Sequence, residues 1–103
     1  MNYPKDLAEL AQALSSPTRL QILDSLKEPK TFSSRREGDL SDDGGVCVSL
    51  IAEQIGVSQP TISRHLEILR RTGLVYTKQV AQRRFHYRDE RAIKATQALF
   101  NNL

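Results

Sequence analysis

The chain has a single cysteine, and it lacks long apolar runs, a secretion signal and internal repeats. Its only cysteine, Cys47, cannot form an internal disulfide, which fits a protein of the reducing cytoplasm. No stretch is long and apolar enough to cross a bilayer, and the N-terminus lacks the basic-then-apolar layout of a secretion signal. Internal repeats and low-complexity tracts are also missing. These absences argue against a disulfide scaffold, a repeat protein and a membrane partner.

The sequence also lacks the motifs of an enzyme. It shows no nucleophile–base pairing, no paired carboxylates in a recognisable cleft and no glycine loop of the phosphate-binding kind. We therefore expect no catalytic activity and no cofactor. With 103 residues, 39% of them hydrophobic and 26% charged, residues 1–103 have the size and composition of one globular domain.

The most informative segment runs from Ser49 to Leu69. Two short amphipathic stretches flank Gly56-Val57-Ser58, the pattern of a helix-turn-helix in which the second helix enters the DNA major groove. Ser49 and Ser58 are expected to cap the two helices, and Gly56 to take the left-handed conformation at the turn. The apolar faces of the two helices are Leu50, Ile51 and Ile55, and Ile62, Leu66 and Leu69.

The other face of the second helix carries hydrogen-bonding side chains of the kind that read base edges. These are Gln59, Thr61, Ser63, Arg64 and His65. Arg64 is the best candidate for a bidentate contact with guanine, and Ser58 with the helix N-terminus is expected to hold a phosphate. The alternative is an ordinary helical hairpin with a polar outer face.

Positive charge gathers around this segment. Residues 1–57 hold 6 basic and 9 acidic residues, whereas residues 58–91 hold 8 basic and 3 acidic ones. The overall net charge is only +3, so its distribution is more informative than its size. A basic surface that coincides with a helix-turn-helix favours nucleic acid as the partner over a merely solvated face.

The remaining periodicities predict further helices and a hairpin. Helices are expected over about 4–15, from Ser16-Pro17 to about Glu28-Pro29, over 49–55, over 59–71 and over 90–102. Alternating residues at 74–77 and 84–87 predict a β-hairpin around 79–83, although without a tight Asn-Gly turn. Its tip carries Arg83 and Arg84, with Lys78 on one arm, and these cations are expected to reach the minor groove or the DNA backbone.

Residues 29–46 show little periodicity and many turn-forming residues. A connection of this length is uncommon in a compact domain, and we expect it to be mobile. Gly44-Gly45 is expected to bring the chain back into the fold, and Val46-Cys47-Val48 to form a short fragment of strand.

The order of these elements is that of a winged helix-turn-helix, mainly α with a small β-hairpin. Three stretches of the chain resemble the ArsR/SmtB family of bacterial transcriptional repressors. They are Ala13-Leu-Ser-Ser-Pro-Thr-Arg-Leu-Gln-Ile-Leu23, Val57-Ser-Gln-Pro-Thr-Ile-Ser-Arg-His-Leu-Glu-Ile-Leu-Arg70 and Gly73-Leu-Val75. The resemblance covers nearly the whole chain except 29–46. It implies a sequence-specific repressor that binds pseudo-palindromic operator DNA as a homodimer.

The family also implies that the first and last helices form the dimer interface. Both helices have apolar faces that exceed what one small core needs, and the alternative is that these faces close the core of a single copy. The residues concerned are Leu7, Leu10, Leu14, Ala92, Ala95, Leu99 and Phe100.

Many members of the family sense metals, but the ligand sets are incomplete in this chain. Where the family has Cys-Val-Cys, this sequence has Cys47-Val48-Ser49, so the second thiolate is missing. A second family site, on the last helix, could begin at Asp89, yet no histidine follows His86. We therefore predict no metal site. His65 is better interpreted as a polar member of the DNA face, and His86 as a strand residue without a special role.

The leading hypothesis is thus a homodimeric DNA-binding repressor, and two alternatives remain open. One is a winged-helix protein-interaction module that binds an acidic partner. The other is a thiol-responsive repressor in which Cys47, near a helix N-terminus, serves as a redox sensor. The argument against a sensor role for Cys47 is that a lone cysteine is usually a small buried apolar residue. The sequence indicates neither the operator nor an effector.

Overall fold

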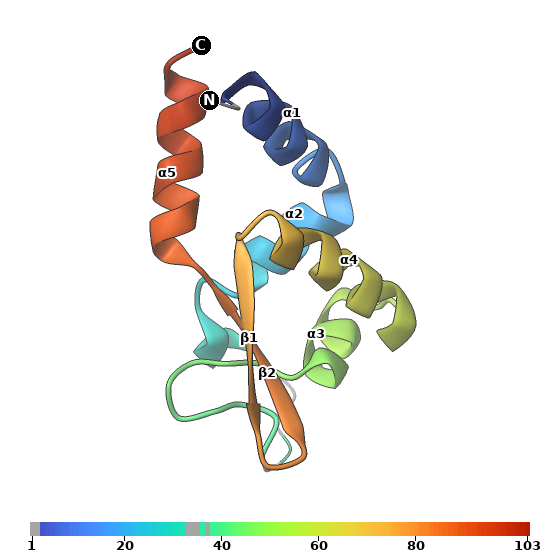
Figure 1. The fold of residues 1–103 in the computed structure, drawn as a ribbon. Helices are drawn as coiled ribbons and strands as arrows, with labels where there is room; N and C mark the ends of the chain where they lie inside the picture. Colours follow the sequence, from blue (N-terminus) through green and yellow to red (C-terminus); the bar gives the residue numbers. More distant parts are fainter. Residues whose placement is uncertain (1–2, 33–35, 37) are drawn as a thin grey trace.

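The structure is a computed structural model that describes residues 3–32, 36 and 38–103, with side chains from residue 7 onward (Figure 1). It confirms the predicted order of five helices and a hairpin. The helices are α1 (Tyr3–Ala13), α2 (Pro17–Ser25), α3 (Val48–Ile55), α4 (Gln59–Arg71) and α5 (Glu90–Asn101), and the strands are β1 (Val75–Val80) and β2 (Arg83–Arg88). A short 3-10 turn, Pro29–Thr31, follows α2.

Side-chain caps fix where three of the helices begin. Ser16 and Ser58 have extended backbones, and their hydroxyls accept the N–H of Arg19 at 3.2 Å and of Thr61 at 3.4 Å. Asp89 caps α5 in the same way, since its carboxylate accepts the N–H of Ala92 at 3.0 Å. Each cap supplies a partner to a backbone donor that a helix end leaves without one. The predicted Ser16 and Ser58 starts are confirmed.

The predicted cap at Ser49 is wrong. Helix α3 begins at Val48, the N-cap position is Cys47, and no side chain caps the helix. Backbone contacts decide this boundary, because the Cys47 N–H donates to the Asp39 carbonyl at 3.0 Å and Val46 forms bridges with Leu40 and His86. These contacts hold Cys47 extended, so the helix starts directly after it. Ser49 therefore lies inside the first turn.

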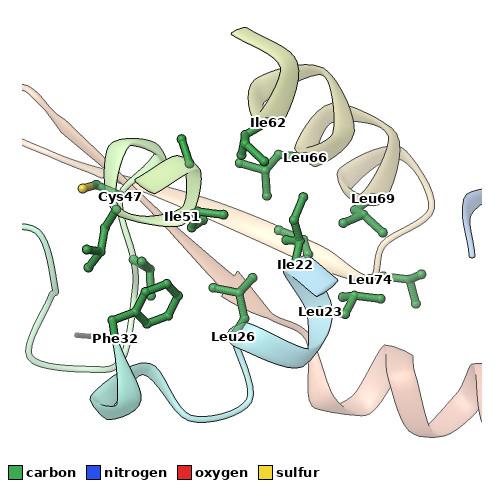
Figure 2. Packing of buried hydrophobic residues seen from close by; sticks show 14 of the residues in the cluster. Ile22, Leu23, Leu26, Phe32, Cys47, Ile51, Ile62, Leu66, Leu69 and Leu74 are labelled. Carbon is green, nitrogen blue, oxygen red and sulfur yellow. The ribbon is translucent and has the colours of Figure 1, made fainter. Parts of the chain in front are cut away.

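One cluster of buried apolar side chains joins the helices to the base of the hairpin (Figure 2). The apolar positions of the helix-turn-helix supply its centre: Leu50, Ile51, Ile62 and Leu69 are all fully buried. Other members come from α1, α2, the segment after α2 and the start of β1, namely Leu10, Ile22, Leu23, Leu26, Phe32, Val46, Leu74 and Val75. Burial of these faces fixes the orientation of α4 against α2 and α3.

The hairpin is tighter than the sequence predicts. The two strands pair from Val75 with Arg88 to Val80 with Arg83, so only Ala81 and Gln82 form the turn. The predicted hairpin around 79–83 is confirmed, and its strands extend further toward the turn than 74–77 and 84–87. Ala81 takes φ +56°, and it is the only residue other than glycine with a positive φ in the described part of the chain. A positive φ at the first turn residue alone is the sign pattern of a type II′ turn, which favours glycine there.

The described parts of segment 29–46 pack against the rest of the fold. Phe32 is buried in the core, and Ser41 and Gly45 form a small turn in which the Ser41 N–H donates to the Gly45 carbonyl at 2.9 Å. A Cβ at Gly45 would lie 2.5 Å from the Tyr87 ring, so glycine permits this close approach. The expected strand fragment holds for Val46 alone. Residues 33–35 and 37 lie outside the described residues, and the mobility of the segment stays a prediction.

Candidate nucleic-acid interface

The turn between α3 and α4 sets the direction in which α4 leaves the core. Gly56 takes φ +80°, and the N–H groups of Gly56 and Val57 both donate to the Ala52 carbonyl, at 2.8 and 3.1 Å. A left-handed residue that reverses the chain here is the glycine C-cap predicted from the sequence. Ser58 then begins α4, and Pro60 occupies its first turn, where a missing N–H costs little. The result is a helix that buries Ile62, Leu66 and Leu69 on one face, and its N-terminal end points away from α2 (Figure 1).

The predicted reading residues of α4 differ in their exposure to solvent. Gln59, Ser63 and Arg64 are exposed, as a DNA-reading surface requires. Arg64 makes no hydrogen bond or ion pair with any residue that the structure describes. Thr61 and His65 are half-buried instead. The Thr61 hydroxyl accepts from the Ser58 hydroxyl at 2.9 Å, whereas His65 contacts α2. Thr61 and His65 are thus less exposed than the other three side chains, and a contact of either with DNA stays a prediction.

Basic residues at the end of α4 are partly neutralised within the helix. Glu67 accepts a hydrogen bond from Arg70, and its second carboxylate oxygen lies 3.5 Å from Arg71 Nε. Such pairs three and four residues apart are modest in free energy because both partners face solvent. Arg70 and Arg71 thus remain exposed cations next to the predicted reading residues.

A cleft of about 210 Å³ lies between α4 and the hairpin. Ser63 and Arg70 line it from the helix, and Thr77, Arg84 and His86 line it from the strands. Arg84 is exposed and forms no ion pair with a described residue, so it is the wing cation best placed to meet a phosphate. The cleft brings α4, the predicted reading helix, and both strands of the hairpin to a common surface.

His86 has a structural role that the sequence did not indicate. Its N–H donates to the Val46 carbonyl at 2.8 Å and its carbonyl accepts from Val46 at 3.0 Å, which ties the hairpin to the segment before α3. Its ring Nδ1 lies 3.0 Å from the Thr77 hydroxyl. Burial, reinforced by Arg84 and Arg70, lowers the pKa of His86 to about 4. The ring is therefore neutral at physiological pH, and it adds no charge to the wing.

Segment 38–46 contacts Arg83 and Lys78, the other two cations predicted to bind DNA from the wing, which is the β1–β2 hairpin. Arg83 Nη1 donates to the Gly38 carbonyl at 2.6 Å and lies 3.5 Å from the buried carboxylate of Asp39. Lys78 Nζ lies 2.9 Å from Asp43 Oδ2, and it also sits over the Tyr87 ring, 4.9 Å from its centroid. A contact of Arg83 or Lys78 with DNA stays a prediction, in which a phosphate oxygen would compete with these protein oxygens for the cation.

Asp43 is the centre of this arrangement. Its Oδ1 accepts from the hydroxyls of Ser41 at 2.6 Å and Tyr87 at 2.7 Å. The hydrogen bond from Ser41, followed by those from Lys78 and Tyr87, holds the pKa of Asp43 well below its usual range. Tyr87 in turn stacks on Tyr76, with ring centroids 4.9 Å apart. In the sequence Asp43 is one of the acidic residues of the turn-rich segment 29–46, and no local signal pairs it with Lys78, 35 positions away.

The lone thiol is enclosed. Cys47 is 7% exposed, and its Sγ lies 3.5 Å from Asp39 Oδ1 and 3.1 Å from the Ser49 hydroxyl. Sensor cysteines are solvent-accessible as a rule, so burial restricts the access of an oxidant. A redox role for Cys47 stays a prediction. Within the described ranges, no group of three His, Cys, Asp or Glu side chains is arranged to hold a metal ion.

The faces predicted for dimerisation lie together at one end of the molecule. The beginning of α1 lies next to the C-terminal end of α5 there, away from the hairpin tip, and the two helices diverge from that point (Figure 1). Leu10 is buried in the core of its own chain, so it is not a free interface residue. Five of the predicted residues are half-buried and Ala95 is exposed; the half-buried ones are Leu7, Leu14, Ala92, Leu99 and Phe100. A role for these side chains in dimerisation stays a prediction.

A groove of about 420 Å³ continues this surface between α2 and α5. Leu14, Leu23, Ile93 and Phe100 line it, together with Leu20, which is 48% exposed. The groove is thus an apolar extension of the α1–α5 end.

In the described residues, no helix is both long and apolar enough to cross a membrane.

The chain is similar in sequence to known transcriptional regulators. The profile of the bacterial regulatory protein, arsR family, matches residues 39–77. The HTH-type transcriptional regulator YbzH of Bacillus subtilis is 41% identical over 85 residues, which cover 82% of this chain and 85% of the relative. The biofilm growth-associated repressor of Xylella fastidiosa is 30% identical over 96 residues, which cover 92% of this chain and 71% of the relative.

Comparison with solved structures extends the similarity to the whole fold. A homodimeric winged helix-turn-helix DNA-binding domain from Mycobacterium bovis, solved by NMR, superposes with a TM-score of 0.68 and 25% identity. The match covers 92% of this chain and 75% of that one. The likeness therefore includes α1, the hairpin and α5 as well as the helix-turn-helix.

Proposed function

The chain belongs to the ArsR family of bacterial winged helix-turn-helix transcriptional regulators, and we propose that it is a homodimeric repressor that binds pseudo-palindromic operator DNA. The observation that carries the proposal is the geometry of α4. Its capped N-terminal half presents Gln59, Ser63 and Arg64 to solvent, and the hairpin stands beside it. A helix with short polar side chains and an arginine on its free face fits the major groove.

Each part of this surface has a distinct task in the proposed complex. Arg64 donates two hydrogen bonds to a guanine, which gives sequence preference. The capped N-terminus of α4 binds a phosphate through its backbone N–H groups and fixes the register. Arg84 contacts the flanking backbone or minor groove from the wing. Occupation of a promoter by the dimer then blocks transcription, which places the protein with the chromosome in the cytoplasm.

Dimerisation makes the proposed binding geometrically specific. Two copies related by a two-fold axis read two half-sites, and their centres are expected about 34 Å apart, or a multiple of that distance. The homodimer formed by the M. bovis domain supports this arrangement. The apolar α1–α5 end is the surface through which we expect two copies to associate.

Selection of bound fragments from random duplex DNA tests the proposal. We expect an enriched site with two-fold symmetry, and we expect Arg64→Ala to weaken binding to it by about 1–3 kcal/mol while random duplexes lose far less. Arg91→Ala is the matched control, because Arg91 is an exposed arginine on α5, away from α4. Fluorescence anisotropy at fixed ionic strength measures both.

Two results would count against this function. Equal losses on selected and random duplexes for Arg64→Ala would remove its base-reading role. A protein that shows no salt-dependent binding to any duplex would not be a DNA-binding repressor, and the interpretation as a protein-interaction module would take its place.

A further inference from the structure

Arg19 connects three helices through its guanidinium. Its Nε donates to the Ala13 carbonyl at 2.6 Å, and its Nη2 donates to the Gln12 carbonyl at 3.2 Å. Both carbonyls belong to the last turn of α1, which has no basic residue of its own. The third nitrogen, Nη1, lies 3.0 Å from Nδ1 of His65 on α4. One side chain on α2 thus joins the end of a predicted dimer helix to the predicted reading helix.

The chemistry of the pair fixes the state of the histidine ring. A guanidinium only donates hydrogen bonds, so Nδ1 of His65 must accept and cannot carry a proton. The neutral ring therefore has its proton on Nε2. Protonation of Nδ1 would replace the acceptor with a second donor and set two cations against each other, so the contact and the charged ring exclude one another.

We propose that Arg19 is a positioning residue, which locks His65 as the Nε2–H tautomer and so sets the orientation of α4 relative to α1. This inference rests on the proposed DNA-binding function for its consequence, but the contact is a property of the protein without DNA. Arginine suits the position because its planar fork reaches three acceptors at once, which the single ammonium of a lysine does not.

The surroundings of the ring strengthen this assignment. Desolvation by burial, followed by the charges of Arg19 and Arg64, lowers the pKa of His65. Arg19 also lines a groove of about 350 Å³ among α1, α2 and α4, in which Glu9 and Arg71 are the other charged side chains. The ring thus stays neutral, and remains an acceptor for Arg19, below the pH at which an ordinary histidine takes up a proton.

The first measurement concerns the protein alone. Nitrogen chemical shifts of the His65 ring report which nitrogen carries the proton as the pH falls. We expect an unprotonated Nδ1 in the parent down to a pH below the ordinary histidine midpoint, and a midpoint shifted upward in Arg19→Lys. A parent ring that is protonated at Nδ1 at neutral pH, or a titration unchanged by Arg19→Lys, would overturn the proposal.

The second measurement concerns the ratio of affinities for the selected operator and a random duplex. Arg19→Lys and His65→Ala should each lower this ratio about threefold to tenfold, the range expected for one hydrogen bond. The double variant should lose no more than the larger single loss, because both substitutions remove the same contact. His65→Asn should restore the ratio, since its Oδ1 offers an acceptor close to the position of Nδ1.

Losses that multiply in the double variant would show that Arg19 and His65 act separately, and would overturn the proposal. Failure of His65→Asn to restore the ratio, with chemical denaturation confirming a folded protein, would do the same. If the parent itself prefers no operator, the proposed function fails, whereas the ring titration still decides whether Arg19 fixes the tautomer.

Discussion

Single residues in this chain depart from the amino acid that their backbone favours, and Ala81 is the plainest case. It occupies the first position of the two-residue hairpin turn with φ +56°. An L-residue with a Cβ pays about 1–2 kcal/mol for a left-handed backbone, whereas glycine does not. The stabilisation from glycine is smaller than this strain, because glycine loses more conformational entropy on folding.

Ala81→Gly is therefore expected to raise the free energy of unfolding by about 0.5–1 kcal/mol. The matched control is Gln82→Gly, since Gln82 has no positive φ to relieve and should lose stability through the unfolded state alone. Urea denaturation followed by circular dichroism measures both. Destabilisation by Ala81→Gly as large as that by Gln82→Gly would show that the left-handed turn is not strained.

At the same scale, the boundaries that could be predicted were those with local causes. Ser16 and Ser58 cap helices because each acts on a backbone N–H three residues away. The Ser49 cap failed because a hydrogen bond from Cys47 to Asp39, outside the predicted helix-turn-helix, moves the helix start. Three of the five predicted reading residues are exposed, whereas His65 contacts Arg19, and no local signal pairs these two residues 46 positions apart.

At the scale of elements, the wing cannot be understood without segment 38–46. Asp43 and Gly38 each hold one wing cation, Lys78 and Arg83 respectively. We expect a DNA phosphate to compete with these oxygens for the two cations. In the proposed complex the segment therefore weakens the contribution of the wing to DNA binding.

Asp43→Asn tests this competition. Loss of the carboxylate releases Lys78 for a phosphate, so affinity for random duplex DNA should rise, and the slope of log affinity against log salt should steepen by about one. Because the pKa of Asp43 is held well below its usual range, the ion pair in the parent persists at any pH suitable for the measurement. Filter binding over a range of salt concentrations gives the slope.

Asp42→Asn provides the control, since it removes the same charge from an exposed neighbour. In the described structure, Asp42 forms no ion pair or hydrogen bond with Lys78. Equal steepening by both variants would mean that general charge, rather than the contact with Lys78, sets the response. No change in either would mean that the wing lysine does not bind phosphate.

The elements themselves were predictable because their signals are periodic and local. All five helices and both strands lie within a few residues of the ranges expected from apolar spacing and caps. The contacts that shape the wing were not predictable, since Asp43 meets Lys78 across 35 positions and Gly38 meets Arg83 across 45. Nothing in the composition of a turn-rich segment indicates which distant cation it will hold.

At the scale of the whole molecule, the predicted dimer surface and the wing occupy opposite ends (Figure 1). Helices α1 and α5 form one end, and the hairpin tip forms the other, with α3 and α4 beside the hairpin. Association through α1 and α5 would leave the reading helix and wing of both copies uncovered. The apolar groove lined by Leu20 and Phe100 adds surface at the same end.

Ala95→Glu tests association without disturbing the monomer, because Ala95 is exposed on α5 and glutamate is a good helix former. In a two-fold interface the substitution acts twice, and a carboxylate buried without a partner costs several kcal/mol. We therefore expect sedimentation equilibrium to show a dimer for the parent and a monomer for Ala95→Glu at micromolar concentration. Operator affinity should fall with it.

Asn101→Glu adds the same charge to another side of α5 and should leave the dimer intact. Circular dichroism must show equal helix content in both variants, so that loss of association is not loss of fold. A parent that sediments as a monomer, or a dimer that tolerates Ala95→Glu, would place the interface elsewhere. The two half-sites could then not be read by copies joined through α1 and α5, because the spacing of the two α4 helices depends on the end at which the copies meet.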